Sequence, residues 1–106
     1  MIPGEKAFFR DVDGKWKECH LWSEYPDLKI SKVKHGGKLV CCPSKDVLAS
    51  ADFEKSCFPK IKEIHLASQV KDSKVRFNSD EVAKALNVAR PVASQFMKSA
   101  AMLQII

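Results

Sequence analysis

Residues 78–96, NSDEVAKALNVARPVASQF, predict two helices joined by a tight turn. Ser79 or Asn78 is placed to cap the first helix, because a short side-chain oxygen accepts hydrogen bonds from the free N–H groups of the first turn. Asn87 is the expected stop, since Asn tolerates the left-handed backbone conformation of a sharp helix exit. Pro91 then falls in the first turn of the second helix, where its missing N–H costs nothing.

Apolar residues recur at helical spacing on both sides of this turn. They are Val82, Ala83 and Leu86 in the first helix and Val92, Phe96, Ala100 and Leu103 in the second. Asp80 and Glu81 fall in the first turn of the first helix, where the helix dipole favours negative charge. Both helices are therefore expected to be short and amphipathic, with Val88 filling the turn between them.

This pattern resembles the helix-turn-helix of bacterial and phage DNA-binding proteins. Ala83 matches the small residue at which two helix backbones approach closely, and residues 88–91 match the turn and the start of the second helix. The sequence departs from the family at Asn87, where glycine is usual, and at Ala89, where a capping serine is usual. The motif covers about a fifth of the chain.

The resemblance extends over residues 59–104 when the preceding segment is included. Pro59 is expected to open a helix over residues 59–71, and residues 75–77 form a short extended link to the motif. Helix, short strand, helix, turn, helix is the order of a winged-helix core, in which a β-hairpin wing usually follows. The sequence ends at Ile106, so no terminal wing is expected.

The N-terminal part predicts two β-hairpins. Asp13-Gly14 is a two-residue turn signal within residues 6–22, and it would place Phe8 opposite Cys19. Trp16, His20 and Trp22 then share one face of the second arm, while Cys19 and Leu21 share the other. The second hairpin runs over residues 28–42 and turns at residues 35–38, with a bulge expected between Ile30 and Val33.

We therefore expect an α+β fold. Residues 1–43 would form an antiparallel β-meander of three to four strands, and residues 44–106 a three-helix, helix-turn-helix-like part, the two making one compact domain. Ser44 is expected to cap a short helix that carries Val47, Leu48 and Ala51.

The net charge of +5 is unevenly distributed. Residues 60–106 hold 8 basic and 4 acidic side chains, whereas residues 1–59 hold 10 and 9. A basic C-terminal half suits a polyanionic partner, although a solvated basic surface without a partner explains it equally well. The sequence shows neither a signal peptide nor a stretch long enough to span a membrane, so a cytoplasmic protein with reduced cysteines is expected.

The family resemblance implies double-stranded DNA as partner, with the helix over residues 90–104 in the major groove. Arg90, Ser94 and Gln95 would meet base edges, since Arg pairs with guanine and Gln with adenine. Phosphate contacts would come from Lys98, Lys84, Arg76 and Lys74. The end of this helix is largely apolar and must be buried, either in the chain's own core or against a second copy in a homodimer.

Cysteine and histidine residues raise the hypotheses of a zinc site and of a Cys–His nucleophile. The spacing of Cys19, Cys41, Cys42 and Cys57 contains no C-x-x-C pair, which argues against zinc. Cys19 and His20 are adjacent on a predicted strand and therefore face apart. No phosphate-binding loop or oxyanion loop is evident, so we expect neither an enzyme nor a cofactor.

The aromatic residues of the first hairpin allow three interpretations. Trp16, His20, Trp22, Phe9 and Tyr25 would stack the bases of a single strand, anchor a protein partner, or form a core face under the helices. The core interpretation is favoured, because large aromatic side chains are usually buried.

Two functional hypotheses follow from these patterns. The first is a small DNA-binding protein, a dimeric transcriptional regulator that reads the major groove. The alternative is a small non-enzymatic interaction module, such as a phage-type inhibitor of a larger complex. In that case Trp16, His20, Trp22 and Tyr25, or the helical surface, would contact the protein target.

Overall fold

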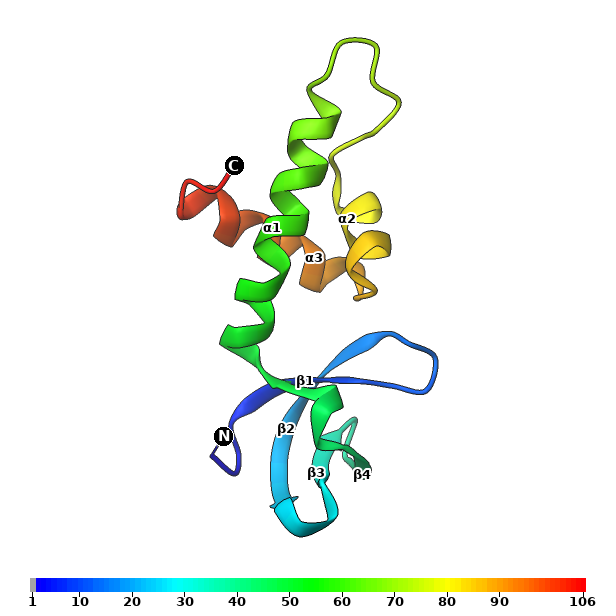
Figure 1. The fold of residues 1–106 in the computed structure, drawn as a ribbon, viewed down its shortest axis with the longest axis vertical. Helices are drawn as coiled ribbons and strands as arrows, with labels where there is room; N and C mark the ends of the chain where they lie inside the picture. The colour runs from blue at the N-terminus through cyan, green and yellow to red at the C-terminus, as the bar shows by residue number, and fades with distance from the viewer. Residues whose placement is uncertain (1) are drawn as a thin grey trace. The chain divides into compact units, whose positions relative to one another are not determined.

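The computed structural model describes residues 2–106 and confirms the α+β class: a five-stranded antiparallel sheet is followed by three helices (Figure 1). The strands are β1 Lys6–Arg10, β2 Trp16–Tyr25, β3 Ile30–His35, β4 Lys38–Pro43 and β5 Val47–Ala49. The helices are α1 Ser50–Ser68, α2 Ser79–Leu86 and α3 Arg90–Met102. Two compact units are present, and the division falls within α1, between Phe53 and Glu54.

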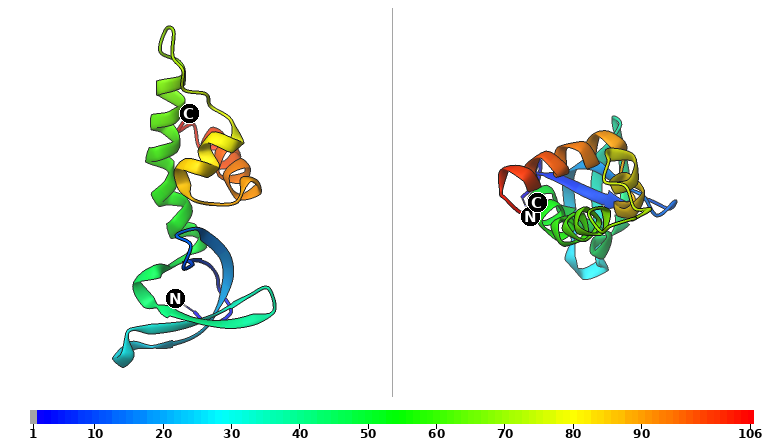
Figure 2. Two further views of the ribbon diagram at one scale, coloured as in Figure 1. Left: turned by 90° about the vertical axis from the view of Figure 1, so that its right-hand side faces the viewer. Right: turned by 90° about the horizontal axis from the view of Figure 1, so that it is seen from above.

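The sheet of the first unit has the order β4-β3-β2-β1-β5, so β4 and β5 are its opposite edges. Only the 3₁₀ turn Ser44–Asp46 separates them in the chain. Four strand spacings in a flat sheet amount to about 19 Å. Four residue steps from Pro43 to Val47 reach at most about 14 Å even when fully extended. The sheet must therefore curl on itself, as Figure 2 shows, into a small open barrel.

The interior of this barrel is filled from all five strands. Its core cluster consists of Ala7, Phe9, Cys19, Leu21, Val33, Cys42 and Val47. Ser31 is the buried polar member, and its hydroxyl lies 2.8 Å from that of Ser44 in the closing turn. On the opposite face of β1, the ring of Phe8 packs 4.5 Å from Phe53 in the first turn of α1. The curled sheet is thus packed inside and, along β1, covered outside.

The first hairpin differs from the prediction by one residue of register. Phe8 pairs with Glu18 rather than with Cys19, because the loop contains three residues instead of two. The Gly14 N–H donates to the Asp11 carbonyl at 2.9 Å, and Gly14 has a φ of +81°. A tight turn followed by a left-handed glycine is the usual geometry of a three-residue hairpin loop.

The second hairpin turns at Gly36-Gly37, within the predicted residues 35–38. The predicted bulge between Ile30 and Val33 is wrong: the irregularity lies in β2, between Leu21 and Ser23, where Trp22 is the extra residue. The alternation in β3 is regular, because Ser31 is buried on the same side as Val33. The buried position of β3 before Val33 is occupied by a serine instead of an apolar residue, so the alternation of this regular strand was not visible in the sequence.

The prediction of a short helix from Ser44 is also wrong, since Val47–Ala49 forms β5 and closes the sheet against β1. Helix α1 begins at Ser50, and Pro59 lies inside it rather than at its start. A proline inside a helix costs about 3 kcal/mol. Phe53, Cys57 and Ile61 follow one another at intervals of four residues and are all buried. Their burial keeps α1 continuous on both sides of Pro59.

The second unit contains the quoted stretch, and its local geometry follows the sequence closely. The Asn78 side chain accepts from the Glu81 N–H at 2.9 Å and caps α2. Asn87 is left-handed with a φ of 56°, and the next N–H, of Val88, bonds to the Ala83 carbonyl at 3.1 Å. This is a Schellman ending, in which a left-handed residue lets the chain satisfy the last helical carbonyls.

Helices α2 and α3 pack on each other through buried apolar side chains and lie beside α1 (Figures 1 and 2). These side chains are Val82, Ala83, Val88, Val92, Ala93, Phe96 and Ala100. The predicted link over residues 75–77 belongs to no helix or strand. Within residues 2–106 no strand follows α3, and no helix has both the length and the apolar character required to cross a membrane.

The C-terminal segment only partly follows the expectation that its apolar residues are buried. Helix α3 ends at Met102, and Leu103 lies outside it with 64% of its surface exposed. Gln104 is left-handed, and the Ile105 N–H returns to the Ala100 carbonyl at 2.9 Å. The chain therefore turns back in a second Schellman ending, which leaves Ile105 half-buried.

We predict that Asn87→Val destabilises the protein by about 1–2 kcal/mol, because a β-branched residue is strained at positive φ. Asn87→Gly should change the free energy of unfolding by only a few tenths of a kcal/mol, since glycine adopts this conformation freely. Chemical denaturation measures both variants. Equal stability of Asn87→Val and the unsubstituted protein would contradict the left-handed turn.

Candidate functional site

The residues predicted to contact DNA occupy one side of α3 and its neighbourhood. At 3.6 residues per turn, Arg90, Ser94, Gln95 and Lys98 fall within an arc of about 140°. Ser94 is half-buried and the other three are exposed. The buried residues of α3 occupy the opposite arc, and the helix contains no Asp or Glu. The result is a polar, positively charged strip along α3.

The remaining predicted phosphate contacts are also exposed. Lys84 lies on α2, whereas Lys74 and Arg76 lie in the link that precedes α2. Lysine and arginine side chains in exposed, irregular backbone can reorient towards a phosphate, so these positions suit contacts that fix the register of a duplex.

Arg90 has partners within the protein. Its Nε donates to the Ser79 hydroxyl at 3.1 Å and lies 3.3 Å from a carboxylate oxygen of Asp80. Both charged side chains are more than half exposed, and an exposed ion pair of this kind contributes at most about 1 kcal/mol. The pair therefore orients Arg90 at the start of α3 without preventing its release to another acceptor.

The aromatic residues of β2 divide between core and surface. Trp16 is half-buried: its ring lies 4.9 Å from Phe53, and the Arg10 guanidinium lies 5.8 Å from its centre. The core interpretation is thus confirmed for Phe9, which is buried, and confirmed in part for Trp16, which is half-buried. It is wrong for Trp22 and Tyr25, which expose 52% and 41% of their surfaces. His20 is exposed on the same strand.

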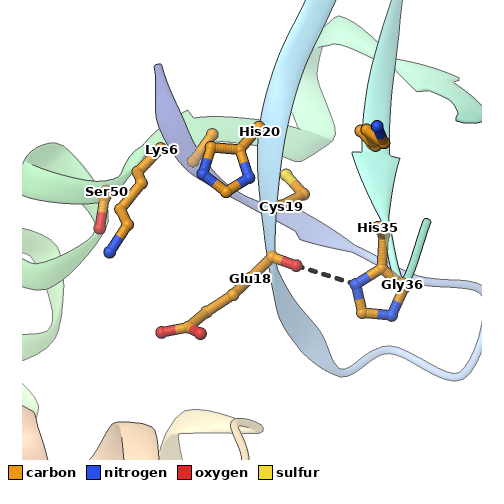
Figure 3. Close-up of a pocket in the computed structure, with 9 residues that line it drawn as sticks. Lys6, Glu18, Cys19, His20, His35, Gly36 and Ser50 are labelled. Carbon is orange, nitrogen blue, oxygen red and sulfur yellow. Dashed lines mark hydrogen bonds between the residues drawn. The ribbon is translucent and has the colours of Figure 1, made fainter. Parts of the chain in front are cut away.

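A cavity of about 230 Å³ opens beside this strand (Figure 3). Its lining includes Lys6, Glu18, His20, Lys34 and His35. The sheet register explains three of them: Lys6 pairs with His20, and His20 pairs with Lys34, so they form one row across β1, β2 and β3. Lys6 and Lys34 are not among the residues predicted from the sequence, because only strand pairing brings them beside His20.

The other side of the cavity is fixed by His35. Its Nδ1 lies 2.8 Å from the Glu18 carbonyl oxygen, and its ring packs edge-on to Phe9 at 5.2 Å. The volume is below the roughly 300–1,000 Å³ of typical small-molecule sites. The cavity is therefore better suited to a small polar group than to a whole cofactor.

The cysteines do not provide a nucleophile beside these histidines. Burial raises the pKa of the Cys19 thiol to about 12, and the nearby Cys42 thiol acts in the same direction. Burial likewise raises the pKa of the Cys42 and Cys57 thiols. Cys41 alone among the four is exposed. In the part of the chain that the structure describes, no group of three or more His, Cys, Asp or Glu residues is placed to hold a metal ion.

We predict that Ellman's reagent modifies one thiol rapidly in the native protein at pH 8 and all four after denaturation, because only the thiolate reacts and three thiols are buried. Cys41→Ser should remove the rapid phase and leave the circular dichroism spectrum unchanged. A rapid native phase that survives in Cys41→Ser would show that at least one of the three buried thiols, Cys19, Cys42 or Cys57, is open to solvent.

Comparison of the chain with protein-family models, with curated proteins and with solved structures gave no match. Two surfaces of this chain carry side chains suited to binding: the polar strip of α3 and the exposed aromatic residues of β2. The strip carries Arg90 and Lys98, and Lys34 and Lys32 lie against the rings of Trp22 and Tyr25. The two surfaces belong to different compact units.

Proposed function

We propose that the protein binds double-stranded DNA through α2 and α3 and acts as a small transcriptional regulator in the cytoplasm. The observation that carries the proposal is the polar side of α3. Arg90, Gln95 and Lys98 are exposed there together, on a helix without acidic side chains whose opposite side is buried. A helix of this kind can enter the major groove while its buried side keeps it attached to the fold.

Within this proposal the exposed residues have distinct roles. Arg90 and Gln95, in the first two turns of α3, are the base-reading residues, for guanine and adenine respectively, and Ser94 assists them. Lys98, Lys84, Arg76 and Lys74 contact phosphates and give affinity without sequence preference. Asp80 pairs with Arg90 in the free protein and releases it when a guanine accepts its hydrogen bonds.

We predict that Lys98→Ala and Lys84→Ala each weaken binding to a mixed-sequence duplex and reduce the slope of log affinity against log salt by about one. Fluorescence polarisation between about 50 and 200 mM salt measures this. Lys15→Ala is the matched control, since it removes the same charge from the β1–β2 loop.

We predict that Arg90→Ala and Gln95→Ala each cost about 1–3 kcal/mol on the sequence that the protein prefers, and relax the preference at one base position. Selection from a random duplex pool identifies that sequence. If no duplex is bound with salt-dependent affinity, the regulator proposal fails. The alternative, a non-enzymatic interaction module or phage-type inhibitor, would then be favoured.

A second candidate function is contact with a protein at the end of α3. Met102 and Leu103 expose 83% and 64% of their surfaces and are adjacent. We propose a second copy of the chain as the partner, because a homodimer would give a DNA-binding protein two helices for two half-sites.

Replacing Met102 and Leu103 together by Ser should convert a dimer to a monomer in sedimentation analysis. Leu66→Ser, at another exposed apolar residue, should leave the dimer intact. A monomer before substitution would rule out the proposed homodimer.

A further inference from the structure

The outer face of β2 presents two aromatic rings to solvent. Trp22 is the extra residue of the β-bulge between Leu21 and Ser23, and more than half of its surface is exposed. The extra residue shifts the alternation that follows it by one, so Tyr25, which pairs with Ile30, lies on the same outer face as Trp22. Tyr25, at the end of β2, is also exposed, and its hydroxyl is held by the Ser23 hydroxyl at 3.2 Å.

A lysine from β3 lies against each ring. The Lys34 ammonium is 5.5 Å from the centre of the Trp22 ring, and the Lys32 ammonium is 5.9 Å from that of Tyr25. Ser31 and Val33 point into the core, so Lys32 and Lys34, which alternate with them, point outward. Both rings and both lysines therefore lie on one outer face. We call these four residues the β2–β3 face.

The charge around the β2–β3 face is predominantly positive. Lys34 pairs with His20 on β2, and His20 pairs with Lys6 on β1, so the three side chains form the row that lines the cavity. Glu24 pairs with Ser31, whose side chain is buried, so it belongs to the other side of the sheet. Glu18 is the acidic residue of the cavity, at the end away from Tyr25. A polyanion that follows Lys34 and Lys32 would meet the two rings and avoid Glu18.

We propose that the β2–β3 face binds single-stranded nucleic acid, with bases stacked on Trp22 and Tyr25 and phosphates held by Lys34 and Lys32. Base–aromatic stacking combined with a basic track is the usual mode of single-strand recognition. A base stack is stronger than an exposed cation–π contact, so each lysine can leave its ring for a phosphate. Duplex DNA does not fit this mode, because its bases are already stacked.

The spacing of the two lysines suits separate phosphates of one strand. Lys32 and Lys34 are two residues apart on β3, which separates them by about 6.6 Å. This is about twice the 3.4 Å that separates successive charges along one strand of a stacked nucleic acid, so the two lysines can meet different phosphates. The surface differs from the strip on α3 in its elements, its chemistry and the form of nucleic acid that it takes.

The fluorescence of Trp22 itself can report binding. The chain has two tryptophans, and Trp16→Phe leaves Trp22 as the only one, with an aromatic ring kept against Phe53. Titration of this variant with an oligo(dT) of about 10 nucleotides should quench the Trp22 fluorescence, because stacking on a base is a short-range contact. The quenching should be lost at high salt. Absence of quenching at about 50 mM salt would overturn the proposal.

Polarisation of a labelled oligo(dT) tests each residue in the otherwise unsubstituted protein. Trp22→Ala should lower the affinity roughly 5- to 150-fold, Tyr25→Ala should also lower it, and Trp22→Phe should retain most of it. Val12→Ala, at an exposed apolar residue of the β1–β2 loop, is the matched control and should have no effect. Thermal denaturation should show that all four variants are folded, since the side chains are exposed.

The two nucleic-acid proposals are separable by crossing the variants. Arg90→Ala with Gln95→Ala should leave oligo(dT) binding unchanged, and Trp22→Ala should leave duplex binding unchanged. If oligo(dT) binding is insensitive to Trp22 and Tyr25, or is lost only with the α3 variants, the proposal is overturned. If the protein binds no single strand at all, the exposed rings would instead be assigned to a protein partner.

Discussion

The three-residue turn Ser44–Asp46 imposes the constraint on which the N-terminal unit depends. It joins the two edge strands of a five-stranded sheet, and so few residues cannot cross a flat sheet of that width. Closure gathers side chains from all five strands into one interior. It also pairs β5 with β1, which starts α1 at Ser50 and brings Phe53 over the outer face of β1.

The second unit depends on two left-handed residues that end its short helices. Asn87 and Gln104 each let the following N–H return to a helical carbonyl, and so direct the chain back towards the apolar side of the helix. After Asn87 this places Val88 between α2 and α3. The buried residues of α3 fix how the helix is rotated about its axis. Arg90, Gln95 and Lys98 lie on the opposite side of the helix and therefore point to solvent.

The two candidate surfaces have different origins in the fold. On α3 the polar strip is formed by residues of a single segment, all within three turns of helix. On the sheet, Trp22 and Tyr25 come from β2 and their lysines from β3, and the bulge in β2 decides that Tyr25 lies on the same face as Trp22. The positive charge beside each of these rings is therefore a property of strand register.

Sequence alone determined the features that depend on neighbours in the chain. These are the α+β order, the cap at Asn78, the stop at Asn87, the Gly36-Gly37 turn and the amphipathic α2 and α3. Each depends on local hydrogen bonds or on helical period, so nearby residues suffice.

Tertiary structure alone decided the rest. Residues 47–49 form β5 where a helix was predicted, and α1 continues through Pro59 instead of starting there. The register of the first hairpin differs by one residue, and the bulge lies at Trp22 in β2 instead of in β3. Tertiary structure also brought Lys6 and Lys34 beside His20, since residues far apart in the chain meet only when the sheet closes. Burial of non-local side chains outweighs local preference at each of these positions, which is why local sequence could not predict them.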